Sequence, residues 1–110
     1  MRKIVYIEPK SYRDPDYPRI GMVKTSKSGK TLYYRDLELT SLGGQGVLGN
    51  YQDQFFREYW VSGAKQNGED ALFGSLTVHI DDGIRKYYWD NIRKQPKNAN
   101  KSSFLSRGKC

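Results

Sequence analysis

Two glycine-rich segments carry residue types that bind phosphate in other proteins. Residues 28–31 read Ser-Gly-Lys-Thr, like the end of a P-loop, and residues 44–49 read Gly-Gln-Gly-Val-Leu-Gly, like a dinucleotide-binding fingerprint. The first has Lys24 where a P-loop needs glycine, and a predicted strand follows it instead of a helix. The second lacks the helix of a βαβ unit. We interpret the first as a turn and residues 43–49 as a loop in which only glycine fits, with phosphate binding by its backbone as the alternative.

Side chains that support metal binding or nucleophilic catalysis are sparse. His79 is the only histidine, and the single cysteine, Cys110, is the last residue. A zinc site needs three or four such ligands, so we expect no metal and no cofactor. A lone cysteine forms no intrachain disulfide, which argues against a secreted, disulfide-stapled scaffold.

The carboxylates are the remaining candidates for chemistry. Asp53, Glu58, Glu69 and Asp70 are predicted to be solvated residues of strands and turns, because nothing in their spacing brings two of them to one cleft. The favoured interpretation is therefore a non-catalytic binding module. The alternative is a small enzyme or enzyme accessory that uses the loop at residues 43–49 with Asp53 and Glu58.

Aromatic residues are abundant, at 14% of the chain with nine tyrosines. Aromatic side chains beside Lys and Arg on an open sheet are how small β domains stack bases. The competing interpretation is that these aromatics form the core, because Ile, Leu and Val are few. The candidate binding surface comprises Tyr33, Tyr34, Gly44, Gly46, Tyr51, Tyr59, Trp60 and Lys65.

Charge is unevenly distributed along this basic chain, whose net charge is +7. Residues 1–35 hold nine Lys and Arg against three Asp and Glu, and residues 36–94 hold six against nine. Residues 95–110 hold four basic residues and no acidic one. This segregation predicts weak, salt-sensitive binding of nucleic acid, with the N-terminal third and the tail contacting phosphates. A protein partner, with the basic tail merely aiding solubility, is the alternative.

Hydrophobic alternation predicts several short strands. Residues 3–7 are apolar on both faces, which is typical of a covered strand. Strands are also predicted at 20–25, 30–35, 37–40 and 76–80. Residues 50–53 and 57–62 favour a hairpin, although their aromatics also fit helical spacing, and Asn67-Gly68 is a hairpin signal.

One amphipathic helix is predicted at about residues 82–94, with Ile84, Tyr88 and Ile92 on its apolar face and Asp81 or Asp82 capping it. The fold class is therefore mainly β (α+β): a small curved antiparallel sheet or an SH3- or OB-like barrel with one C-terminal helix. We expect one domain over residues 1–94 and a basic, disordered tail at 95–110. No apolar run approaches the ~20 residues of a membrane helix, so we expect a cytoplasmic protein without a membrane partner.

From residue 28 to about residue 93 the chain resembles a group of small, uncharacterised bacterial proteins. The matching segments are residues 28–34 (SGKTLYY), 41–46 (SLGGQG), 50–53 (NYQD) and 58–63 (EYWVSG), then Lys65, Gly68, Leu72, Tyr88-Trp89 and Ile92-Arg93. Some members carry the name deoxyxylulose-phosphate synthase, but 110 residues cannot hold the two cofactor-binding domains of that large thiamine-diphosphate enzyme. The resemblance implies no activity, and both charge-rich ends lie outside it.

Overall fold

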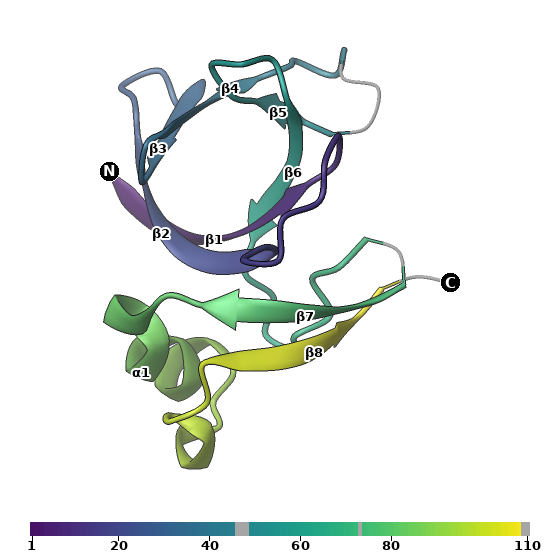
Figure 1. Ribbon diagram of the computed structural model, residues 1–110. Coiled ribbons are helices and arrows are strands. Elements are labelled where there is room, and N and C mark those ends of the chain that lie inside the picture. Colours follow the sequence, from purple (N-terminus) through teal and green to yellow (C-terminus); the bar gives the residue numbers. More distant parts are fainter. Residues whose placement is uncertain (46–48, 73, 109–110) are drawn as a thin grey trace.

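The structure, a computed structural model, describes residues 1–45, 49–72 and 74–108. Its upper part is a closed, six-stranded antiparallel barrel, and a lower layer of two strands and a helical segment packs beneath it (Figure 1). In the described residues the strands are β1 (Arg2–Pro9), β2 (Arg19–Thr25), β3 (Thr31–Tyr34), β4 (Leu37–Ser41), β5 (Tyr51–Gln52), β6 (Glu58–Gly63), β7 (Ser75–Ile80) and β8 (Ser103–Arg107). The predicted mainly β fold with a small barrel and a C-terminal helix is confirmed.

Strand β1 closes the barrel because it pairs antiparallel with both β2 and β6. Val5 and Ile7 point into the barrel, whereas Tyr6 points outward into the second core. Both faces of β1 are therefore buried, as its apolar pattern predicts. The barrel interior is filled by buried residues from five of its strands: Val5, Ile7, Val23, Leu32, Tyr34, Leu39, Tyr59 and Val61.

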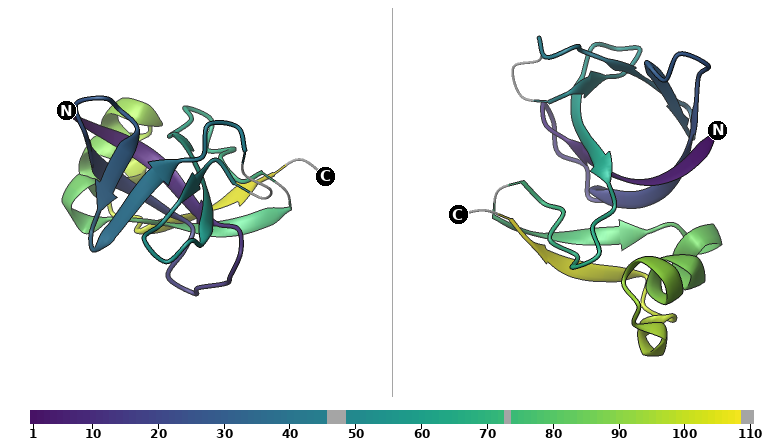
Figure 2. Two further views of the ribbon diagram at one scale, coloured as in Figure 1. Left: turned by 90° about the horizontal axis from the view of Figure 1, so that it is seen from above. Right: turned by 180° about the vertical axis from the view of Figure 1, so that it is seen from behind.

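The lower layer extends the sheet from β2. Strand β7 pairs parallel with β2 over only two positions, Arg19 with His79 and Ile20 with Ile80, and β8 runs antiparallel to β7 (Figures 1 and 2). A second core lies between this layer and the outside of the barrel. Its buried members are Tyr6, Ile20, Val78, Ile80, Ile84, Tyr88 and Trp89.

The predicted helix is a continuous helical segment at residues 82–92, which consists of a 3-10 turn (Asp82–Ile84), α1 (Arg85–Tyr87) and a π turn (Tyr88–Ile92). Ile84 and Tyr88 are buried, and Ile92 packs against the second core, as predicted. Asp81 is not a side-chain cap, because its carboxylate instead accepts bonds from Arg19, Tyr34 and Arg35. No helix in the described part of the chain is long and apolar enough to cross a membrane.

Two local expectations are wrong, and a third prediction, the hairpin favoured for residues 50–62, is confirmed. The tail is not disordered throughout, because residues 103–107 form β8 and pair with β7 along their length, from Ser75 opposite Arg107 to His79 opposite Ser103. Asn67-Gly68 makes a turn but no hairpin, because the flanking strands β6 and β7 pair with other strands. The hairpin forms in place of the helical alternative for residues 51–60, because β5 and β6 pair with each other.

Candidate functional site

The predicted binding residues do not form one surface. Tyr34 and Tyr59 are buried in the barrel interior, and Tyr51 packs against that core from its edge. Tyr34 donates to Asp81 Oδ2 at 2.7 Å and Tyr59 donates to Asp53 Oδ2 at 2.9 Å, so both hydroxyls have internal partners. For Tyr34 and Tyr59 the core interpretation is correct and they offer no stacking surface, whereas Tyr51 is partly exposed.

Tyr33 alone of the predicted tyrosines stands on the outside of the barrel, with 43% of its surface exposed. It lies opposite Lys24 in the pairing of β2 with β3, and Lys24 lies opposite Arg2 in the pairing of β1 with β2. The side chains of Ile4 and Met22 form the next rung of the same outer surface. We call this surface, made by Arg2, Ile4, Met22, Lys24 and Tyr33, the basic face.

A groove continues the basic face toward the helical segment. It has a volume of about 530 Å³ and is lined by Arg2, Lys3, Ile4, Met22, Gly83, Ile84, Tyr87 and Ile92. Tyr87 is 56% exposed, and Met22 is 42% exposed. Figures 1 and 2 show the N-terminal end of β1 and the helical segment on the same side of the molecule. The sequence analysis did not identify Met22 and Tyr87 as surface candidates. Strand pairing places Met22 near Tyr33, and packing of the helical segment places Tyr87 in the same groove as Arg2.

The cations of the basic face form no ion pair among the described residues, and the nearest carboxylate along the strand pairing is Glu38, opposite Tyr33 on β4. Within the described ranges, none of the ion pairs includes Arg2, Lys3 or Lys24. Arg2 and Lys24 are directly opposite across the strand pair, an arrangement that is destabilising for like charges. The face therefore concentrates positive potential beside exposed aromatic and apolar side chains.

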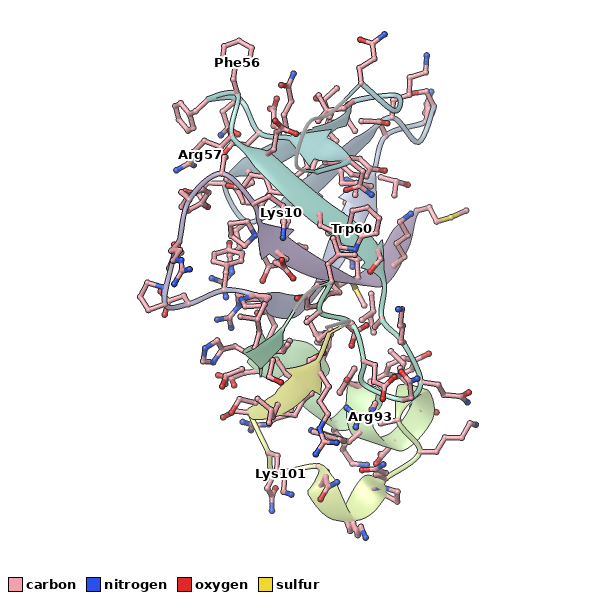
Figure 3. The ribbon with its side chains drawn as sticks, turned by 90° about the vertical axis from the view of Figure 1, so that its right-hand side faces the viewer. Lys10, Phe56, Arg57, Trp60, Arg93 and Lys101 are labelled. Carbon is pink, nitrogen blue, oxygen red and sulfur yellow. The ribbon has the colours of Figure 1, made fainter. Side chains whose placement is uncertain are left out.

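Trp60 and Lys65 lie in a second depression, which we call the Trp60 cleft. Its volume is about 440 Å³, and its lining is Trp60, Ser62, Lys65, Glu69, Asp70, Ala71, Leu72, Arg107 and Gly108. Trp60 is on β6, where the barrel meets the lower layer (Figure 3). The cleft joins two of the predicted binding residues to Arg107, from a strand that the sequence pattern did not predict.

Two of the carboxylates expected to be solvated are in fact buried. Asp53 is 3% exposed and accepts hydrogen bonds from the backbone N–H groups of Phe55 and Arg57, from Arg57 Nε and from the Tyr59 hydroxyl. Burial alone would raise the pKa of Asp53, but these donors hold it below its ordinary value. Its lone pairs are occupied, so it is poorly placed to accept a proton from a substrate.

Asp70, at 2% exposed, is the other buried carboxylate. One oxygen accepts the Lys65 N–H at 2.7 Å, and the other has no hydrogen-bond partner. Burial raises the pKa of Asp70 above its usual value, against the opposing effect of the Lys65 N–H and of the charges on Lys65 and Arg93. Asp70 thus differs from Asp53 in having an unused acceptor.

In the described residues of the loop at 43–49, backbone geometry explains why glycine is present. Gly43 and Gly44 are exposed and have positive φ angles of 58° and 84°, and a Cβ at Gly49 would overlap the Tyr59 carbonyl. Glu58 Oε1 accepts the Gly49 N–H at 3.0 Å, so this carboxylate holds the loop. Gly46, which belongs to the predicted surface, lies outside the described residues.

His79 is partly exposed, and its Nε2 lies 3.1 Å from the Pro15 carbonyl oxygen. Residues 1–45, 49–72 and 74–108 contain no group of three or more His, Cys, Asp or Glu that could hold a metal ion.

Comparisons with protein-family models, curated proteins and solved structures give no match for this chain.

Proposed function

We propose that this domain is a non-catalytic module that binds single-stranded nucleic acid across the basic face. The observation that carries the proposal is the exposed pair of Arg2 and Lys24, which face each other across β1 and β2 without a carboxylate partner in the described structure. A phosphate placed between two such cations relieves their repulsion and releases counterions.

The apolar residues of the face supply the second half of the recognition. Two exposed aromatic rings belong to Tyr33, which lies beside Lys24, and to Tyr87, which lines the groove. Met22 of β2 lines the same groove. Bases of a single strand are free to stack on such rings, whereas the bases of a duplex are already stacked on one another. This combination favours single strands over duplexes.

The state of the carboxylates favours binding over catalysis. Asp53 and Glu58, which the enzyme alternative requires, hold a turn and a loop of the barrel through their hydrogen bonds. A general base needs a free lone pair within reach of its substrate. The two carboxylates are better explained as parts of the scaffold.

The test measures binding of fluorescent single-stranded RNA, single-stranded DNA, duplex DNA and heparin at several salt concentrations. We expect single strands to bind more tightly than duplex, with affinity falling as salt rises. Removing both charges with Arg2→Gln and Lys24→Gln should reduce the magnitude of the log–log salt slope by about 0.7, since the two cations share one phosphate and each neutralised phosphate of a single strand contributes about 0.7. Tyr33→Ala should weaken binding by ~1–3 kcal/mol without changing the slope.

The matched control removes two charges elsewhere, with Lys97→Gln and Lys101→Gln. Lys101 lies at the bottom of the lower layer, away from the barrel (Figure 3), so this variant has the same net charge but an intact basic face. It should bind nearly as the parent protein does. Equal affinity for all four polyanions, or equal losses in the two double variants, would show that only net charge matters and would overturn the proposal.

A further inference from the structure

The Trp60 cleft lies on the opposite side of the molecule from the basic face. Binding of nucleic acid at the basic face therefore does not explain the cleft. In Figures 1 and 2 the described C-terminal end of β8, which contributes Arg107 to the cleft, lies across the molecule from the N-terminus. Figure 3 faces this side and shows Trp60 beside β6 on the barrel, above the lower layer. The volume of about 440 Å³ suits a small molecule.

The inner part of the cleft has unsatisfied polar atoms. Asp70 Oδ2 and Ser62 Oγ are both buried without a hydrogen-bond partner. Ser106 Oγ accepts the N–H groups of Asp70 and Ala71 at 2.9 and 3.0 Å, so β8 fixes the backbone that carries the carboxylate. A buried carboxylate oxygen without a donor is costly, and a ligand that donates to it recovers that energy.

The mouth and wall of the cleft have different chemistry. Lys65 and Arg107 are exposed cations that take part in no ion pair among the described residues. Trp60, Ala71 and Leu72 supply apolar surface. The cleft therefore offers an acceptor inside, an apolar wall, and a mouth at which two cations accompany the exposed Glu69 carboxylate.

We propose that the Trp60 cleft binds a free α-amino acid with an apolar side chain. The ammonium group donates to Asp70 Oδ2 and Ser62 Oγ, the carboxylate lies against Arg107 and Lys65, and the side chain packs on Trp60. The indole ring also favours a nearby cation. A nucleotide fits less well, because the amino group of its base is neutral and brings no positive charge to the buried carboxylate.

The experiment titrates the full chain with L-leucine and follows the backbone amide signals of Lys65 and Arg107 by NMR, with Trp60 fluorescence followed in a Trp89→Phe background. L-leucine should produce saturable shifts. N-acetyl-L-leucine lacks the ammonium and L-leucinamide lacks the carboxylate, so each should bind about tenfold more weakly or worse. Adenosine monophosphate serves as the nucleotide probe and should bind more weakly than leucine.

Two variants separate the two ends of the ligand. Asp70→Asn keeps the shape and should weaken leucine binding about tenfold, whereas the same substitution at exposed Asp36 should leave it unchanged. Arg107→Gln, on the surface, cannot disturb the core and should weaken leucine but not leucinamide. The proposal is overturned if leucine does not bind, if all three leucine compounds bind equally, if adenosine monophosphate binds more tightly, or if Arg107→Gln affects leucine and leucinamide alike.

Discussion

At the scale of single residues, the acidic side chains organise this small barrel more than its apolar pattern suggests. Asp53 ties together the turn at residues 53–57, because two backbone N–H groups, one guanidinium and one phenol donate to it. Tyr12 joins the same cluster through its hydroxyl, 2.7 Å from that of Tyr59, and through its ring, over which the Arg57 guanidinium lies at 4.6 Å. The cluster closes one end of the barrel.

Asp53→Asn should lower the free energy of unfolding at pH 7 by ~1–3 kcal/mol, because the amide offers a single acceptor where the carboxylate offers two charged oxygens. The pKa of Asp53 is lower in the folded protein than in the unfolded chain. The Asp53 charge therefore contributes its full stabilisation above the unfolded pKa of about 3.9, and this stabilisation is lost as the pH falls through the folded pKa. The difference between parent and variant should therefore shrink in the acid range below about pH 4.

Urea unfolding at pH 7 and pH 3 measures this difference, with Asp36→Asn as the exposed control. A difference that stays constant between the two pH values would mean that the Asp53 charge contributes nothing to stability.

The buried carboxylates also mark the limit of sequence reasoning about the site. Asp and Glu are seldom fully buried, so Asp53 and Asp70 were predicted to be solvated. Arg57 and Tyr59, four and six residues further along the chain, bind the Asp53 carboxylate, and Ser106, 36 residues away, binds the backbone N–H of Asp70. The acidic residue types alone indicate neither set of partners. The sequence does not indicate which aromatics are exposed: Tyr33 and Tyr34 are adjacent on β3, and only the face of the strand places the first outside the barrel and the second inside.

At the scale of elements, β8 is short and polar, yet it completes the lower layer. Phe104 stacks on Tyr88 with ring centroids 5.6 Å apart and meets Trp89 edge-on at 5.9 Å. Ser106, on the same face, is fully buried and accepts the N–H groups of Asp70 and Ala71. One strand thus anchors both the helical segment and the loop that carries Asp70.

Ser106→Ala should destabilise the protein by ~1–3 kcal/mol, because two buried N–H groups lose their only acceptor. Ser102→Ala, the matched control, removes an exposed hydroxyl and keeps the backbone bond from Ile80, so its effect should stay within ~0.5 kcal/mol. Chemical denaturation gives both values, and hydrogen exchange should show faster exchange at the Asp70 and Ala71 amides in the first variant alone. Similar stability for the two variants would show that β8 is not docked in solution as described.

The elements that local patterns predict have apolar residues that either form a continuous run, as in β1, or alternate, as in β7. Val5, Ile7 and Val23 mark β1 and β2, and the alternation of Leu76, Val78 and Ile80 marks β7. Strand β8 has a single apolar pair, Phe104-Leu105, so its pairing with β7 and not its own pattern makes it a strand. The same reasoning explains Asn67-Gly68: the turn forms, but a hairpin requires flanking strands that pair with each other.

At the scale of the whole molecule, the barrel and the lower layer are joined at β2. The parallel pairing of β2 with β7 is short, and the Asp81 carboxylate supplements it by binding Arg19 of β2 at 2.8 Å, Tyr34 of β3 at 2.7 Å and Arg35 at 3.2 Å. Gly21 makes this junction possible. A Cβ there would overlap the Tyr34 ring and lie 2.8 Å from Asp81 Oδ2.

We expect Gly21→Ala to destabilise the barrel and the lower layer together, by ~1–3 kcal/mol, because the added methyl group overpacks the junction that both share. Each layer has its own tryptophan, Trp60 on β6 and Trp89 in the helical segment. Fluorescence in a Trp60→Phe background therefore reports on the lower layer, and fluorescence in a Trp89→Phe background reports on the barrel.

Within each background, Gly21→Ala should shift the urea midpoint by the same free energy, since a cooperative unit unfolds in one step. Gly63→Ala is the matched control, because a Cβ at Gly63 meets no atom within 4 Å and should leave both midpoints nearly unchanged. A shift confined to one reporter would mean that the two layers unfold separately. The Trp60 cleft, built from both layers, would then be lost in two steps.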